Sequence, residues 1–190
     1  SIILEQLPVL KKSLRIAFVT ETYPPEVNGV ANTAARFVEG LRERNHEIQL
    51  VRPRQNRSDR AGDGEGMREV LMRGLPIPRY PGLKMGLPAK RALGSLWSRQ
   101  RPDIVHIVTE GPLGWTARRV CLREGLKFTT GFHTRFAEYA AARIPLPGIL
   151  SLGWEVLRRF HAPSQAVMVP TKSTQLLTAL KAVVAAIYRF

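Results

Sequence analysis

An apolar run leading through a Pro- and Gly-bearing loop into an amphipathic segment constrains this chain more than any other feature. The run covers residues 14–20, the loop residues 21–30 and the amphipathic segment residues 31–44. In an open parallel α/β sheet, this succession presents backbone N–H groups and a helix N-terminus to an anionic ligand. The sequence therefore predicts a site beyond the carboxyl end of its first strand.

Apolar runs and amphipathic segments alternate along most of the chain, which is typical of βαβ units with a parallel sheet. We expect strands at 15–20, 47–51, 70–72, 104–108, 127–130 and 166–169, and helices at 33–44, 88–99, 113–124, 136–142, 150–160 and 172–186. The predicted fold is α/β: a Rossmann-like parallel sheet flanked by helices. Residues 54–66 are expected to form a mobile loop, and residues 75–87, rich in proline, an irregular segment.

The chain is strongly basic, because 29 Lys and Arg residues face 15 Asp and Glu residues, for a formal net charge of +14. Such a charge favours anionic partners: phosphorylated substrates, an acidic membrane surface or nucleic acid. The alternative is an arginine-rich composition spread over solvated helix faces. Nucleic acid is disfavoured because no basic run is interleaved with aromatic residues. A local cluster of basic residues comprises Arg52, Arg54, Arg57 and Arg60.

Two further features bear on location. No apolar run reaches the length of a transmembrane helix, and the N-terminal residues lack the order of a secretory signal. The lone Cys121 fits a reducing compartment, and its place in a predicted helix indicates a core residue rather than a nucleophile. We therefore expect a cytoplasmic protein, with contact at the inner face of a membrane as a further expectation.

Three ordered blocks carry a family resemblance: residues 15–30, with Tyr-Pro-Pro and Asn-Gly-Val, residues 102–114 and residues 130–139. Together they resemble retaining glycosyltransferase family 4, in particular the bacterial branch of GDP-mannose-dependent α-mannosyltransferases and glycolipid glycosyltransferases. The resemblance implies a GT-B fold, in which two Rossmann-like domains face each other across a cleft. This chain would be the N-terminal half. Residues 14–178 would form the acceptor-binding domain, residues 1–13 an N-terminal extension and residues 179–190 a truncated crossover, with the C-terminal domain missing.

The resemblance also implies a function. A mannose- or glucose-type sugar would pass, with retention, from a GDP- or UDP-linked donor to a hydroxyl of a lipid or glycan acceptor. No metal or other cofactor is expected, nor is nucleic acid a partner, and this chain alone is expected to be inactive. The alternative is a non-catalytic Rossmann-like module that binds a phosphorylated ligand or an anionic membrane.

Two groups of residues at predicted strand ends are the main site candidates. Asn28, Gly29 and Val30 lie where the first strand passes into the first helix, and Gly29 can take a positive φ and let a ligand approach the backbone. By resemblance this turn touches the donor diphosphate; the alternative is an ordinary βα turn. His133 also follows a predicted strand, so it should face the same crevice. By resemblance it contacts the transferring sugar as the catalytic residue, whereas an isolated histidine is more often structural.

Weaker candidates lie nearby. Glu110 follows the fourth predicted strand and would either bind acceptor hydroxyls or cap the next helix. Glu21 has a similar place after the first strand, with a weaker case. The acceptor side would also include Thr134, Arg135 and Tyr139. His46 is expected to be exposed at a turn, His106 to be a satisfied core residue, and His161 to end a helix.

Overall fold

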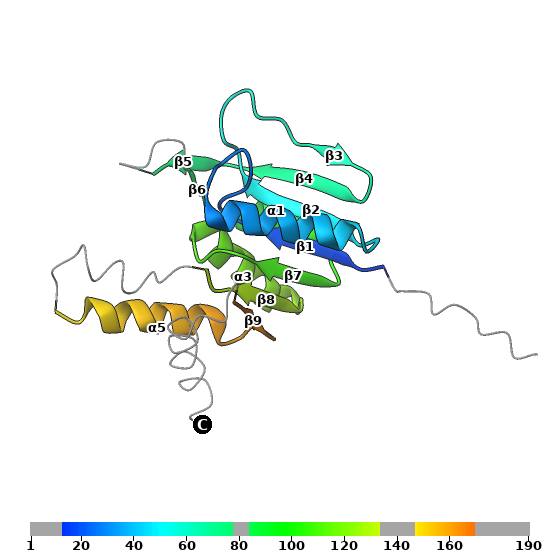
Figure 1. The fold of residues 1–190 in the computed structure, drawn as a ribbon. Coiled ribbons are helices and arrows are strands. Elements are labelled where there is room, and N and C mark those ends of the chain that lie inside the picture. The colour runs from blue at the N-terminus through cyan, green and yellow to red at the C-terminus, as the bar shows by residue number, and fades with distance from the viewer. Residues whose placement is uncertain (1–12, 78–83, 134–146, 170–190) are drawn as a thin grey trace, which may run out of the picture.

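The computed structural model describes residues 13–77, 84–133 and 147–169, which form a mostly parallel sheet with helices on both faces (Figure 1). The seven strands have the order β3-β4-β2-β1-β7-β8-β9. Within this sheet, as far as the structure describes it, only the pairing of β3 with β4 is antiparallel. The strands are β1 (Arg15–Val19), β2 (Glu47–Pro53), β3 (Asp63–Gly64), β4 (Met67–Met72), β7 (Ile104–Ile107), β8 (Phe128–Gly131) and β9 (Val167–Met168). The predicted α/β fold with a parallel sheet is confirmed.

Strand β1 lies at the centre of the sheet, between β2 and β7. The chain runs outward from β1 through β2 to β4 and then crosses back to β7 on the other side of β1. In sheets of this kind, ligands bind in the crevice outside the carboxyl ends of the strands at such a reversal. The topology therefore puts a crevice between the loops that follow β1 and β7.

The helices cover the two faces of the sheet because residues of β1 alternate between two cores. Ile16 and Phe18 pack in one core with residues of α1 (Gly29–Arg42). Ala17 and Val19 pack in the other, which receives residues from α2 (Lys90–Arg99), α3 (Pro112–Glu124) and the end of α5 (Ile149–His161). This alternation follows from the period of two along a strand. Among the described residues, no helix is both long and apolar enough to cross a membrane.

Two segments expected to be irregular contain short strands. Within residues 75–87, β5 (Gly74–Pro76) and β6 (Lys84–Gly86) form an antiparallel pair. Within residues 54–66, β3 pairs with β4. The loop expected at 54–66 is confirmed apart from the two residues of β3, whereas the irregular segment expected at 75–87 was wrong where β5 and β6 pair. The short strands escaped the sequence because they are defined by their partners rather than by a local alternating pattern. The predicted helices at 136–142 and 172–186, and the boundary at 178, lie outside the described residues.

Candidate functional site

A cavity of about 570 Å³ occupies the expected crevice. The loop after β1, the first turn of α1, the segments that follow β5, β7 and β8, and the start of β6 all contribute to it. It is lined by Glu21, Thr22, Glu26, Asn28, Gly29, Val30, Thr33, Ile77, Lys84, Thr109 and His133. The glycine-bearing turn and the imidazole thus share one cavity, as the strand-end argument predicted. We call this cavity the central pocket.

The N-terminus of α1 opens onto the central pocket and is held by Asn28. The Asn28 side chain accepts a hydrogen bond from the N–H of Ala31 at 2.8 Å and donates one to Thr22 Oγ1 at 2.7 Å. The Thr22 hydroxyl in turn donates to Glu26 Oε2. The described residues supply no hydrogen-bond partner for the N–H groups of Gly29 and Val30, so these groups and the helix dipole are available to an anion.

Gly29 differs from the expectation in its backbone conformation. Gly29 is not among the residues with positive φ. It is instead the first residue of α1, which begins four residues before the predicted helix. A Cβ atom added at Gly29 would meet nothing within 4 Å. The absence of a side chain is therefore not needed for the turn itself. It leaves open space at the helix N-terminus, on the wall of the central pocket.

His133 reaches the central pocket from the end of β8. Its ring folds back over Gly131, where an added Cβ atom would lie 2.5 Å from the imidazole Nε2. Burial lowers the pKa of His133 below its ordinary value, an effect that nearby Glu110 opposes. The imidazole is therefore neutral at neutral pH and can both donate and accept hydrogen bonds. The described residues supply no partner for Nε2.

Glu21 has a larger structural role than the sequence suggested. Its Oε1 accepts a hydrogen bond from the N–H of Leu113 at 2.8 Å, and its Oε2 accepts one from the N–H of Gly86. Its own N–H donates to Thr109 Oγ1 at 3.0 Å. One carboxyl group therefore joins β1, the β5–β6 hairpin and the first turn of α3. Burial raises the pKa of Glu21 to about 7, although these backbone hydrogen bonds oppose the shift.

Glycines on two sides make room for this carboxyl group. A Cβ atom added at Gly86 would lie 2.7 Å from Glu21 Oε2, and one added at Gly111 would overlap the same carboxyl group. Sequence reasoning ranked Glu21 low because its partners Gly86 and Leu113 lie 65 and 92 residues away. Gly86 and Gly111 were the sequence features that could have indicated a closely packed side chain. Nothing in the sequence around them indicates that this side chain is Glu21.

Glu110 does not cap α3, so that half of its prediction was wrong. The cap position is Gly111, which has no side chain to contribute, and Glu21 accepts from the first turn instead. Glu110 Oε1 lies 3.5 Å from Nε2 of the fully buried His161. It is also not among the residues lining the central pocket. Contact of Glu110 with acceptor hydroxyls stays a prediction.

The remaining histidines have structural places. His106 is buried in β7, its Nδ1 lies 2.9 Å from Thr129 Oγ1, and burial lowers its pKa to about 4. His161 ends α5, as predicted, with Nδ1 2.8 Å from Thr130 Oγ1. His46 is half-buried rather than exposed, because its Nδ1 accepts from the N–H of Leu14 at 3.2 Å. Cys121 is buried in α3, also as predicted.

Three further predicted site residues, Thr134, Arg135 and Tyr139, lie outside the described residues. The structure brings together Asn28, Gly29, Val30 and His133 from the predicted set and adds Glu21, whereas Glu110 is not in the lining of the central pocket.

Solved structures resemble this chain in fold. A sucrose-phosphate synthase from Thermosynechococcus elongatus superposes with a TM-score of 0.56 over 81% of this chain and 41% of that chain, at 11% identity. A putative UDP-N-acetylglucosamine 2-epimerase from Listeria monocytogenes superposes with a TM-score of 0.54 over 92% and 42%, at 13% identity. The fold and the pocket at the carboxyl ends of its strands define a Rossmann-like α/β domain of the GT-B type.

The chain belongs to glycosyltransferase family 4, because the model of that family matches residues 27–181. It is similar to a GDP-mannose-dependent α-mannosyltransferase of Mycobacterium tuberculosis, with 27% identity over 85% of this chain and 43% of the relative. A sulfoquinovosyl transferase of Arabidopsis thaliana matches at 24% identity over 85% and 31%. An α-monoglucosyldiacylglycerol synthase of Acholeplasma laidlawii matches at 27% identity over 84% and 41%. The chain thus spans less than half the length of these relatives.

Proposed function

We propose that this chain is the acceptor-side domain of a retaining glycosyltransferase. The enzyme transfers a mannose- or glucose-type sugar from a GDP- or UDP-linked donor to a hydroxyl of a lipid or glycan. One observation carries the proposal: in a family 4 chain, the open N-terminus of α1 and the imidazole of His133 line the same pocket. Relatives named as mannosyl-, sulfoquinovosyl- and monoglucosyldiacylglycerol-forming enzymes support it.

In this proposal, α1 stabilises the departing diphosphate. The N–H groups of Gly29 and Val30, together with the helix dipole, face the position where negative charge develops on the leaving group. Preorganised donors of this type each contribute a few kcal/mol, roughly 2.7–4, in enzymes where one has been removed. Asn28 keeps the helix end in place through its hydrogen bonds to Ala31 and Thr22. Backbone N–H groups and basic side chains, rather than a metal ion, neutralise the diphosphate.

His133 orients the sugar in this proposal. A neutral imidazole holds a sugar hydroxyl without adding charge, which fits the lowered pKa of His133. Both oxygens of Glu21 accept from backbone N–H groups, so this carboxyl group holds the pocket wall together. In the proposal, the proton of the acceptor hydroxyl passes to the leaving phosphate. This route requires no pair of free carboxylates such as a glycosidase uses.

The rest of the catalytic cleft comes from a second Rossmann-like domain in this proposal. Such a domain would hold the nucleotide, and this chain alone would be inactive. We place the enzyme in the cytoplasm, with the net charge of +14 favouring contact with anionic lipid at the inner face of the membrane.

The test is transfer of labelled sugar from GDP-mannose and UDP-glucose to lipid extracts by the protein with its second domain, with the anomeric configuration of the product read by NMR. His133→Ala should lower turnover about 100-fold, the loss typical when a reacting group is no longer held in position. His46→Ala, at the opposite edge of the sheet, is the matched control and should retain turnover. Unchanged turnover in the His133 variant, with folding intact by circular dichroism, would remove its role.

A second candidate is a non-catalytic module that binds a phosphorylated ligand or an anionic membrane. The high positive charge favours it. Ligand binding at the central pocket with no sugar transfer from any donor, even with a second domain present, would select this candidate.

A further inference from the structure

A second cavity, of about 320 Å³, lies next to the central pocket and is lined by basic side chains. Lys84 belongs to the lining of both cavities. The second cavity is lined by Arg54, Asn56, Arg57, Leu71, Met72, Arg73, Gly74 and Lys84. We call it the basic pocket. It contains four basic side chains and no carboxylate in its lining.

These cations come from three segments that meet at one edge of the sheet. Arg54 and Arg57 belong to the loop after β2, Arg73 joins β4 to β5, and Lys84 starts β6. Parallel pairing of β2 with β4 brings the ends of these two strands together, with Pro53 opposite Met72. The backbone N–H of Arg54 continues this pairing by donating to the carbonyl of Met72 at 2.9 Å. The cluster is therefore a product of the topology.

Asp59, in the same loop as Arg54 and Arg57, is paired mainly with Arg52, although its charge also acts on Arg54. Asp59 turns toward the sheet, where both of its oxygens accept from the Arg52 guanidinium at 2.7 and 3.0 Å. Arg52 is buried and lowers the pKa of Asp59, so this carboxylate is ionised and already paired. Among the residues that the structure describes, no ion pair links Arg54, Arg57, Arg73 or Lys84 to a carboxylate.

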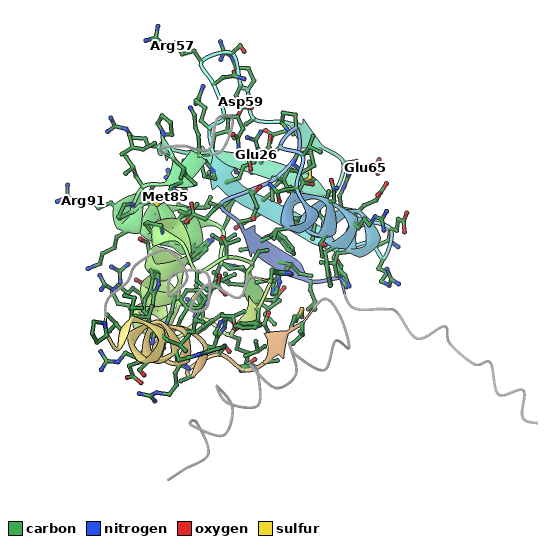
Figure 2. All side chains as sticks on the ribbon, turned by 60° about the vertical axis from the view of Figure 1, so that its left-hand side comes forward. Glu26, Arg57, Asp59, Glu65, Met85 and Arg91 are labelled. Carbon is green, nitrogen blue, oxygen red and sulfur yellow. The ribbon has the colours of Figure 1, made fainter. Side chains whose placement is uncertain are left out.

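The loop that carries Arg54 and Arg57 is also hydrogen-bonded to the sheet. Arg52 binds Glu69 of β4 at 2.6 Å as well as Asp59, and the N–H of Gln55 donates to Asp59 Oδ2 at 2.7 Å. The Arg54 side chain donates to the carbonyl of Asp59 at 2.9 Å. Figure 2 shows Arg57 at the outer tip of this loop and Asp59 nearer the sheet. These hydrogen bonds link the loop to the sheet beside the basic pocket, while its expected mobility stays a prediction.

Four cations line this cavity, and none of them forms an ion pair with a carboxylate in the described part of the chain, which favours an anion that can accept several hydrogen bonds at once. Arginine guanidinium groups match phosphate oxygens in a bidentate manner, and lysine adds a point charge. Carboxylates offer fewer acceptor oxygens to guanidinium groups from different segments. The apolar part of the lining, Leu71 and Met72, leaves room for the non-ionic portion of a ligand beside the charged group.

We propose that the basic pocket binds the phosphate group of an organic phosphate, at a site separate from the central pocket. The phosphate belongs either to the headgroup of an anionic phospholipid or to a small soluble phosphate ester. Because Lys84 borders both cavities, the bound phosphate positions its ligand beside the central pocket. The inference concerns binding only and stands whether or not the protein transfers sugar.

The test compares two variants that each remove two positive charges. Arg57→Gln/Arg73→Gln removes cations of the basic pocket, whereas Arg36→Gln/Arg119→Gln removes exposed arginines of α1 and α3 outside either pocket. All four side chains are exposed, so neither variant should disturb folding, which urea unfolding checks. Net charge changes equally in both.

Each protein is titrated with glycerol 3-phosphate, with glycerol as the neutral control, and is sedimented with phosphatidylglycerol or phosphatidylcholine vesicles. We expect the pocket variant to lose at least about 10-fold in affinity, relative to wild type, for one of the two anionic probes, and the control variant less than about 2-fold. Loss confined to vesicles identifies a lipid headgroup, and loss with glycerol 3-phosphate a soluble ester. Equal effects of both variants, or no binding of either anionic probe at low salt, would overturn the proposal.

Discussion

Replacing Gly29 with alanine separates the stability of α1 from its proposed role in binding a diphosphate. Gly29 is the first residue of α1, has no positive φ, and has nothing within 4 Å of an added Cβ atom. The added methyl group therefore fits the fold and reduces the conformational entropy of the unfolded chain. We expect Gly29→Ala to raise the free energy of unfolding by about 0.4–1 kcal/mol.

The same methyl group would occupy space on the wall of the central pocket, where a phosphate must approach the N–H groups of Gly29 and Val30. Loss of one hydrogen bond to a charged group costs about 1.5–3 kcal/mol. Since 1.4 kcal/mol is a factor of ten in affinity, the dissociation constant for GDP or UDP should rise roughly 10- to 150-fold. Isothermal titration of the protein with its second domain measures this change, and urea unfolding measures stability.

Gly40→Ala is the matched control on the same helix. Its added Cβ atom would meet only Arg44 Nη1, the end of a flexible exposed side chain, at 3.2 Å. It should stabilise α1 by up to about 1 kcal/mol and leave nucleotide affinity unchanged. Unchanged affinity in Gly29→Ala would refute the close approach of the diphosphate to this turn. A loss of stability there would refute the helical geometry assigned to Gly29.

Three further changes test the structure around the pocket. Glu21→Gln should destabilise the chain by about 1–3 kcal/mol in urea at pH 8, because an amide NH₂ replaces one of two oxygens that accept from backbone N–H groups; equal stability would show these bonds to be unimportant. His106, with a pKa near 4 when folded, takes up its proton first in the unfolded state as pH falls below 6.5. Stability should therefore drop by up to about 3 kcal/mol between pH 6.5 and 4, and His106→Gln should remove that part of the slope. Arg52→Met should cost about 3–5 kcal/mol by removing the cation that pairs with the half-buried Asp59 and the buried Glu69. Adding Asp59→Asn and Glu69→Gln should restore much of the loss, and a urea midpoint that stays low would point to packing instead.

Local patterns in the sequence were sufficient for the regular elements of the sheet. The run at residues 15–20 predicted β1 to within a residue, and the amphipathic segment after it predicted α1, although the helix begins at Gly29 rather than residue 33. The prediction omitted the first turn of α1 because that turn depends on the helix cap. The Asn28 side chain accepts from the N–H of Ala31, an interaction that a hydrophobic pattern does not reveal. The strand-end argument also predicted that Gly29 and His133 would share a crevice, and they do.

Contacts between distant segments escaped the sequence. Glu21 was ranked below Glu110, yet Glu21 is the residue that reaches the first turn of α3. The glycines and charges of the loop at 54–66 did not reveal that Arg52, buried at the end of β2, binds Asp59 within that loop. In both cases the sequence shows the charged residues, but it does not indicate which distant residues they bind.

The sequence by itself determined the alternation of strands and helices, and with it the edge of the sheet where a ligand would bind. These follow from periodicity and from short-range turn chemistry, which act between residues close together in the chain. Only the tertiary structure decided which carboxylates are used internally and which cations stay available, because that depends on which strand ends the topology brings together. Parallel pairing of β2 with β4 and the return of the chain to β7 placed Glu21 against α3, and gathered the basic pocket around Lys84.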